Sequence, residues 1–348
     1  MASSVIMNET RRAKKFHLPD EIGIFVVLLL VAAVFCILSS SFRTYNNMLS
    51  LLLNGAVIAF LALGQTLVLL TGGIDLSTGS NIAMTGVLCA YLMNAGVPWI
   101  FASLLAVGAG GLIGLFNGLV IQYGGLPPFI VTFATMGVAS SIPLIMTGSS
   151  SIMVADQGFS WIGQGTVFSV PVPVVLLIVF AVIVALILSW TRFGVQVYAV
   201  GGNRTAARLA GVSLAKVTVS VYVMSGLFAG VAGLIDTSRL MVGFPTAGTG
   251  NELFFSIAAA VVGGVSLFGG TGSVLGAMIG AVMIATVSNG LNVVNVNSYW
   301  QSLVIGLIIL GAVGLDTFRR HRMGAPLPGI LRRRVRSGDR QSAHADVV

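Results

Sequence analysis

Long runs of apolar residues follow one another along almost the whole chain. A helix needs about 20 apolar residues to cross the hydrocarbon of a bilayer, and the sequence offers ten segments near that length. They are residues 22–42, 48–71, 80–97, 99–122, 128–147, 171–191, 217–238, 252–268, 272–294 and 298–317. The connections 72–79 and 269–271 are short and glycine-rich, so each is a tight turn or a re-entrant segment. The sequence therefore predicts an all-α polytopic membrane protein with about ten transmembrane helices.

The composition excludes a water-soluble domain. Only 8% of the residues are charged and 56% are hydrophobic, whereas soluble domains carry about 25% charged residues. A β-barrel is disfavoured because its strands alternate over about ten residues, while the run 172–188 is continuously apolar. The first apolar run has no small-residue cleavage site after it, so we interpret it as a membrane span and not as a removable signal.

The basic residues gather in three parts of the chain, namely the N-terminal segment 1–21, the loop 192–216 and the tail 318–348. With ten spans these parts fall on one side of the membrane, and the positive-inside rule makes that side cytoplasmic. Both termini are then cytoplasmic, and residues 22–317 form the transmembrane domain. The tail is rich in Pro, Arg and Ser, a composition typical of disorder.

No catalytic motif is readable in the sequence. The chain has no GxxxxGK phosphate-binding loop, and its histidines, His17, His321 and His344, lie in the terminal segments without forming a metal cluster. Cys36 and Cys89 lie in apolar runs and are interpreted as packing residues. We therefore expect that the chain is not an enzyme, that it binds no cofactor or metal itself, and that any energy source is an ion gradient or another subunit.

Three acids lie in or near the spans beyond the first helix, at Asp75, Asp236 and Glu252. Asp236 is three residues from Arg239, so the two are predicted to pair. Asp75 sits in the break GGIDLSTGS (72–80), where it either caps and orders the chain or binds substrate or an ion. The break is echoed by GGVSLFGGTGS (263–273), which leaves open an internal repeat.

The loop 192–216 contains a short predicted helix with Asn203 as its N-cap and Gly211 as its end. A helix this short is marginal alone and needs a surface to dock into. Its alternative is a membrane-surface helix with basic residues directed at lipid phosphates. The candidate docking residues are Asn203, Arg204, Ala206, Ala207, Arg208, Leu209, Ala210 and Gly211.

Three stretches resemble the permease subunits of ribose-type bacterial ABC sugar importers. They are GQTLVLLTGGIDLSTGS (64–80), YAVGGNRTAARLAGV (198–212) and PTAGTGNELFFSIAAAVVGGVSLFGGTGSVLGAMIG (245–280), and SNGLNVVNVNSYWQ (288–301) extends them. Two departures stand out: phenylalanine, at 254 or 255, replaces an acid that is usual in the family, and Thr271 replaces a frequent Lys or Arg.

The resemblance implies a cobalamin-permease-like importer fold of ten helices. It also implies that two permease copies, identical or paralogous, pair around a central path. An external sugar-binding protein would deliver substrate, and a cytoplasmic ABC ATPase, carrying ATP and Mg, would drive the cycle. The segment 203–211 then corresponds to the family's coupling segment, which sits in a groove on the ATPase.

A path for a monosaccharide or similar polyol needs short neutral polar groups and aromatic groups that hold hydroxyls weakly. Such side chains are equally suited to interhelical hydrogen bonds, which is the alternative for each of them. The candidates, with Asp75 as a secondary one, are Asn54, Gln65, Thr66, Asn81, Asn117, Thr132 and Phe133. The alternative functions are an ion-coupled secondary transporter, disfavoured by the scarcity of buried acids, and a scaffold, disfavoured by the glycine-rich breaks.

Overall fold

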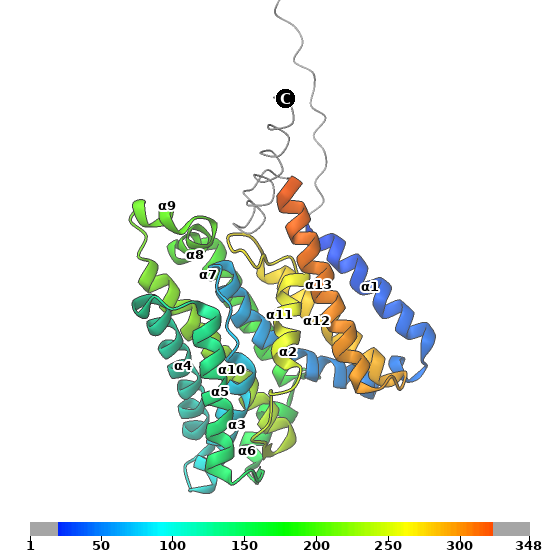
Figure 1. Cartoon of the computed structure of the whole chain (residues 1–348). Helices are drawn as coiled ribbons and strands as arrows, with labels where there is room; N and C mark the ends of the chain where they lie inside the picture. The colour runs from blue at the N-terminus through cyan, green and yellow to red at the C-terminus, as the bar shows by residue number, and fades with distance from the viewer. Residues whose placement is uncertain (1–19, 323–348) are drawn as a thin grey trace, which may run out of the picture.

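A computed structural model of the chain describes residues 20–322, which form a bundle of helices with four two-residue strands (Figure 1). In chain order the elements are α1 (Asp20–Leu38), η1 (Ser41–Arg43), α2 (Tyr45–Leu70), α3 (Thr78–Asn94), α4 (Trp99–Gly124), α5 (Pro128–Thr147), β1 (Ile152–Met153), α6 (Gln157–Gln164), β2 (Thr166–Val167), β3 (Val170–Pro171), α7 (Val172–Trp190), α8 (Arg192–Gly202), α9 (Arg204–Leu209), α10 (Leu214–Leu240), β4 (Val242–Gly243), α11 (Glu252–Val262), α12 (Val274–Val293) and α13 (Ser298–Arg322).

Each of the ten predicted apolar segments contains a helix. Within residues 20–322, seven helices are long and apolar enough to cross a membrane, namely α1, α2, α4, α5, α7, α10 and α12. The apolar parts of α3, α11 and α13 are shorter, so the polytopic membrane architecture is confirmed while the count of ten spans stays a prediction. The predictions for residues 1–19 and 323–348 lie outside the described residues. The predicted start of the tail at residue 318 is wrong, because α13 extends through 318–322.

The prediction of one helix over 252–268 is wrong beyond Val262, where α11 ends. Gly263 and Gly264 follow, and Gly264 has a φ of +88°, a left-handed backbone that stops a helix. The second break is therefore 263–273 and not the short turn 269–271. Two helices were also missed: α6, capped by Asp156, and α8, which precedes α9.

The two ends of the bundle differ in what they carry. Helices α8 and α9 lie at the upper end in Figure 1, together with the start of α1 and the end of α13, and α6 lies at the lower end. The cations of the loop 192–216 therefore share one end with the two described termini. This is the arrangement that the basic-residue pattern predicted.

The most extensive contact between two helices is that of α4 with α10, which glycines allow to become very close. A Cβ at Gly114 would overlap the carbonyl oxygen of Tyr222, and one at Gly226 would overlap that of Gly110. Small residues at spacings of four let helix backbones approach in this way. Asn81 of α3 joins the contact by donating from Nδ2 to the carbonyl oxygens of Gly226 (3.2 Å) and Gly110 (3.4 Å).

At the α8 end, three glycine-rich segments meet backbone to backbone. The N–H of Gly270 donates to the carbonyl oxygen of Leu70 at 2.9 Å, and a Cβ at Gly201 would overlap that same oxygen. The hydroxyl of Tyr198 donates to the carbonyl oxygen of Gly272 at 2.9 Å. Burial raises the pKa of this phenol, so it stays protonated as a donor. The two breaks that echo each other in sequence are thereby joined through α8.

This contact predicts that alanine is destabilising at one of two neighbouring glycines and has little effect at the other. Gly201→Ala should lower the stability of the protein by about 1–3 kcal/mol, the usual cost of overpacking, because the new methyl has no room beside Leu70. Gly202→Ala is the matched control, since a Cβ there meets nothing within 4 Å. Thermal unfolding of both variants in detergent measures the difference. Equal melting temperatures would contradict the close contact.

Candidate functional site

The segment 192–211 is built as two capped helices at one end of the bundle. The side chain of Thr191 caps α8 by accepting from the N–H of Gly194 (3.3 Å), and Asn203 Oδ1 caps α9 by accepting from Ala206 (2.9 Å). Gly211 follows α9 with a φ of +82°. The predicted cap and the predicted end of the short helix are both confirmed.

Helix α9 exposes most of its surface. Ala207 is its buried residue, whereas Leu209 is 84% exposed and Arg208 is exposed beside it. Arg204 donates from Nη2 to Gln122 Oε1 at 2.8 Å, so this cation is partly used to hold α9 against α4. An exposed leucine next to a cation, on a helix fixed at both ends, provides a small mixed surface for a partner.

Asp75 lies in the break between α2 and α3 and is 1% exposed. Its Oδ1 accepts from the N–H of Ser77 (3.0 Å) and from its hydroxyl (2.6 Å), and its Oδ2 accepts from Ser225 of α10 (2.8 Å). Asn117 of α4 donates to the Ser77 hydroxyl at 3.0 Å. The carboxylate therefore ties the break to α10 and indirectly to α4, which supports the loop-ordering interpretation.

Most of the predicted path residues lie in the packed interior. Gln65, Thr66, Asn81, Asn117 and Thr132 are all 0% exposed. Thr132 of α5 donates to the carbonyl oxygen of Ile74 in the break (3.2 Å), and Thr66 bonds within its own helix. These contacts, with those of Asn81 and Asn117, favour interhelical hydrogen bonding over a pore-lining role. The amide of Gln65 has no hydrogen-bond partner in the part of the chain that the structure describes.

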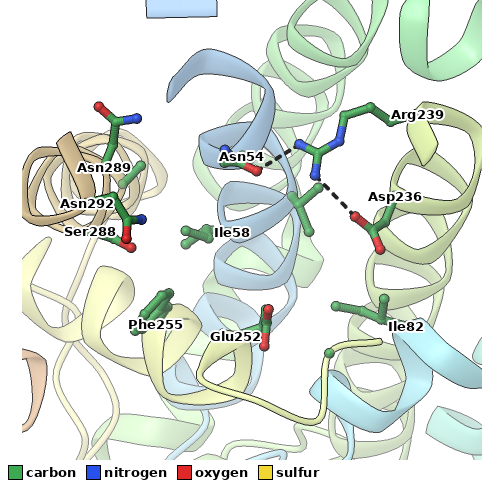
Figure 2. A pocket seen from close by; sticks show the side chains of 13 residues that line it. Asn54, Ile58, Ile82, Asp236, Arg239, Glu252, Phe255, Ser288, Asn289 and Asn292 are labelled. Atoms are coloured by element: carbon green, nitrogen blue, oxygen red, sulfur yellow. Dashed lines mark hydrogen bonds and ion pairs between the residues drawn. The ribbon is translucent and has the colours of Figure 1, made fainter. Parts of the chain in front are cut away.

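Asn54 and Phe133 differ from the other candidates because each lines a cavity. Phe133 stacks on Phe129 at 6.0 Å between ring centroids and lines a mainly apolar cavity of about 400 Å³ formed by α3, α5 and the segment 248–254. Asn54 lines a polar cavity of about 240 Å³ between α2, α10, α11 and α12 (Figure 2).

The polar cavity contains groups that the sequence did not suggest as a set. Arg239 donates to Asn54 Oδ1 at 2.8 Å and pairs with Asp236 at 3.5 Å, which confirms the predicted pair. Glu252 and Phe255 of α11 lie below them in Figure 2. On the opposite side are the polar residues of α12, Ser288, Asn289 and Asn292. Asn289 follows Ser288 directly and Asn292 comes three residues later, so the three side chains lie on one face of α12. This pattern of polar residues is readable in the sequence.

A metal centre finds no support in the described part of the chain. Among the residues described within 20–322, no three His, Cys, Asp or Glu side chains come together in a way that could hold a metal ion. Cys36 and Cys89 are free thiols, half-buried and buried. Cys89 lies against Met93 and Ser103 in the core, in keeping with a packing role.

Comparison of the sequence with known proteins places the chain among importer permease components. Residues 47–313 match the family described as the branched-chain amino acid transport system, permease component. The ribose import permease protein RbsC of Bacillus subtilis is 39% identical over 318 residues, which cover 91% of this chain and 98% of the relative. The D-allose transport system permease protein AlsC of Escherichia coli is 35% identical, over 89% of this chain and 97% of the relative.

The L-arabinose ABC transporter permease protein AraH of Azospirillum brasilense is 34% identical, over 90% of this chain and 92% of the relative. No solved structure matches the chain. These relatives are transport subunits and not enzymes.

The Asp75 network predicts a graded response to substitution. Asp75→Asn keeps one acceptor oxygen, and the Ser225 hydroxyl can turn to accept from the new amide, so folding should change little. Asp75→Leu leaves the buried donors of Ser77 and Ser225 unpaired, at about 1–3 kcal/mol for each group. Membrane abundance and thermal unfolding test this order. Equal damage from both variants would instead mean that the negative charge itself is required.

Proposed function

The chain belongs to this family of importer permease components, and from that premise we propose that it forms the translocation path for a monosaccharide in an ATP-driven bacterial importer. The family description names amino acids, but relatives that cover most of the chain are named for ribose, allose and arabinose. The sugar class therefore follows from these relatives. Which sugar is carried is not specified by them.

One structural observation carries the assignment to an ATP-driven importer. Helix α9 is capped, fixed to α4 through Arg204, and exposes Leu209 and Arg208 at the end of the bundle that holds the basic loop. Such a short helix gains little stability by itself. We therefore assign α9 as the segment that docks on a cytoplasmic ABC ATPase. In this proposal ATP and Mg are bound by the ATPase and not by this chain.

The remaining assembly follows from the same assignment. The end of the bundle with α8 and α9 faces the cytoplasm, and both termini lie on that side, in agreement with the positive-inside rule. Ten helices cross or enter the membrane in the cobalamin-permease-like arrangement. A second permease copy, identical or paralogous, completes the path, and an external sugar-binding protein supplies the substrate.

Ion coupling fits the structure less well. An ion-coupled carrier needs buried acids that are available to protons or cations. Here Asp236 pairs with Arg239, and both oxygens of Asp75 accept hydrogen bonds from serines. These two acids are engaged in structural contacts, which leaves Glu252 as the one acid of the three that is not paired or hydrogen-bonded within the described residues.

Energy coupling is tested by changing the exposed face of α9. The double variant Arg208→Glu, Leu209→Asp should fold normally, since both side chains are exposed, but should reduce binding-protein-stimulated ATP hydrolysis in the reconstituted importer by at least about tenfold. Lys216→Glu is the matched control, because Lys216 is an exposed cation of the same loop outside α9. Full stimulation in the double variant would rule out α9 as the docking segment.

A further inference from the structure

The polar cavity lies within one chain and at the opposite end of α10 from α9. Asp236 and Arg239 are in the last turns of α10, whereas Leu214, next to α9, begins that helix. The rise of an α-helix places Leu214 and Asp236 about 33 Å apart along the axis. With α9 on the cytoplasmic side, the cavity is in the external half of the protein, where a released substrate arrives.

One wall of the cavity is held in place by hydrogen bonds outside it. Asn289 exchanges two side-chain hydrogen bonds with Asn47, at 2.9 and 3.0 Å. Gln301 of α13 donates to Asn292 at 2.5 Å and accepts from Ser288 at 3.4 Å. The polar side chains of α12 are thus fixed before any ligand enters, which lowers the entropic cost of binding.

The other wall presents charged groups. Arg239 is held between Asn54 and Asp236, so its guanidinium is fixed in position. Glu252 begins α11, and its Oε2 is shielded from solvent without a hydrogen-bond partner among residues 20–322. A buried acceptor without a donor is costly. Glu252 also lines the cavity, where its other oxygen, Oε1, offers an acceptor that a hydroxyl donor can reach.

Apolar side chains complete the cavity. Val57 is one of its lining residues, and Ile58 and Phe255 line it between the polar groups (Figure 2). The combination suits a sugar ring, which presents C–H groups on its faces and hydroxyls at its edge, each able to donate and to accept. The volume of about 240 Å³ is below the range of about 300–1,000 Å³ typical of drug-sized ligands, which fits a single ring.

We propose that this cavity is a binding site for one neutral monosaccharide in each permease chain, with the Glu252 carboxylate accepting a hydrogen bond from a sugar hydroxyl. The proposal rests on the proposed function and adds a site within the chain, separate from the path shared by two copies. Two carboxylates face one guanidinium in the cavity, so sugar acids and sugar phosphates are disfavoured by charge. Because several polar groups are already bonded to the protein, affinity is weak and release is easy.

The test is calorimetric titration of the full chain in lipid nanodiscs, without ATPase or binding protein, with D-ribose, D-allose and L-arabinose in turn. At least one sugar should bind at one molecule per chain. Glu252→Ala should weaken that binding by about tenfold or more, as expected for a hydrogen bond to a charged group. Glu252→Gln keeps one acceptor oxygen and should fall between the wild type and the alanine variant.

Two controls separate a local effect from misfolding. Phe254→Ala removes a side chain of the same helix that lines the apolar cavity instead, and Asp156→Asn removes an acid that caps α6 with a residue that caps equally well. Both should bind sugar normally, and all variants should keep the thermal unfolding temperature of the wild type before sugar is added.

Several outcomes would overturn the proposal. These are no sugar binding, one sugar per two chains, or equal affinity in the wild type and Glu252→Ala. Preferential binding of a cation such as spermidine would also overturn it. Sugar uptake by the reconstituted importer is measured in parallel. Uptake without binding to the isolated chain rejects the site but leaves the permease function standing, whereas absence of uptake of any sugar rejects the function itself.

Discussion

The direct backbone contact between α4 and α10 is the interaction on which the other features depend. In a membrane, helices gain little from the hydrophobic effect against each other, so close van der Waals packing has to hold them together. Glycines at 110 and 114 of α4 and at 226 of α10 provide that closeness. With its position fixed, α10 connects three regions: its start follows α9, its centre bonds Asp75 through Ser225, and its end lines the polar cavity.

Neutral polar residues of the interior add hydrogen bonds between α3, α4, α10 and the break at 71–77. A polar group in hydrocarbon is expensive unless the protein satisfies it, and the Nδ2 groups of Asn81 and Asn117 are positioned where another helix or a break supplies an acceptor. The irregular backbone at 71–77 is tolerated for the same reason, since the hydroxyls of Thr132 and Tyr222 donate to the carbonyl oxygen of Ile74. The break is thus a packed structural element of the bundle.

The sequence predicted helices where a local signal was sufficient. Apolar runs located the ten segments, and the Asn203 cap with Gly211 located α9, because caps and glycine act within one turn. It did not separate pore-lining from packing residues, since the same side-chain types serve both purposes. Gln65 and Asn81 have side chains suited to a path but are fully buried, while Ser288 and Asn292 line a cavity, because burial depends on which helices become neighbours. The early end of α11 depends on how Gly263 fits against α12, another long-range contact.

The contacts of α8 have a mechanical consequence for the proposed docking of α9 on an ATPase. Gly201 lies against the Leu70 carbonyl, and Gly270 donates to that same oxygen, so α8, the end of α2 and the break 263–273 meet without side chains between them. Side chains can absorb a displacement by changing rotamer, but packed backbone cannot, because interiors are dense and resist compression. A shift of α8, which is joined to α9 through Asn203, therefore has to move both helix breaks. The two breaks in turn are continuous with α3, α11 and α12, so force applied at α9 has a rigid route to the helices around the polar cavity.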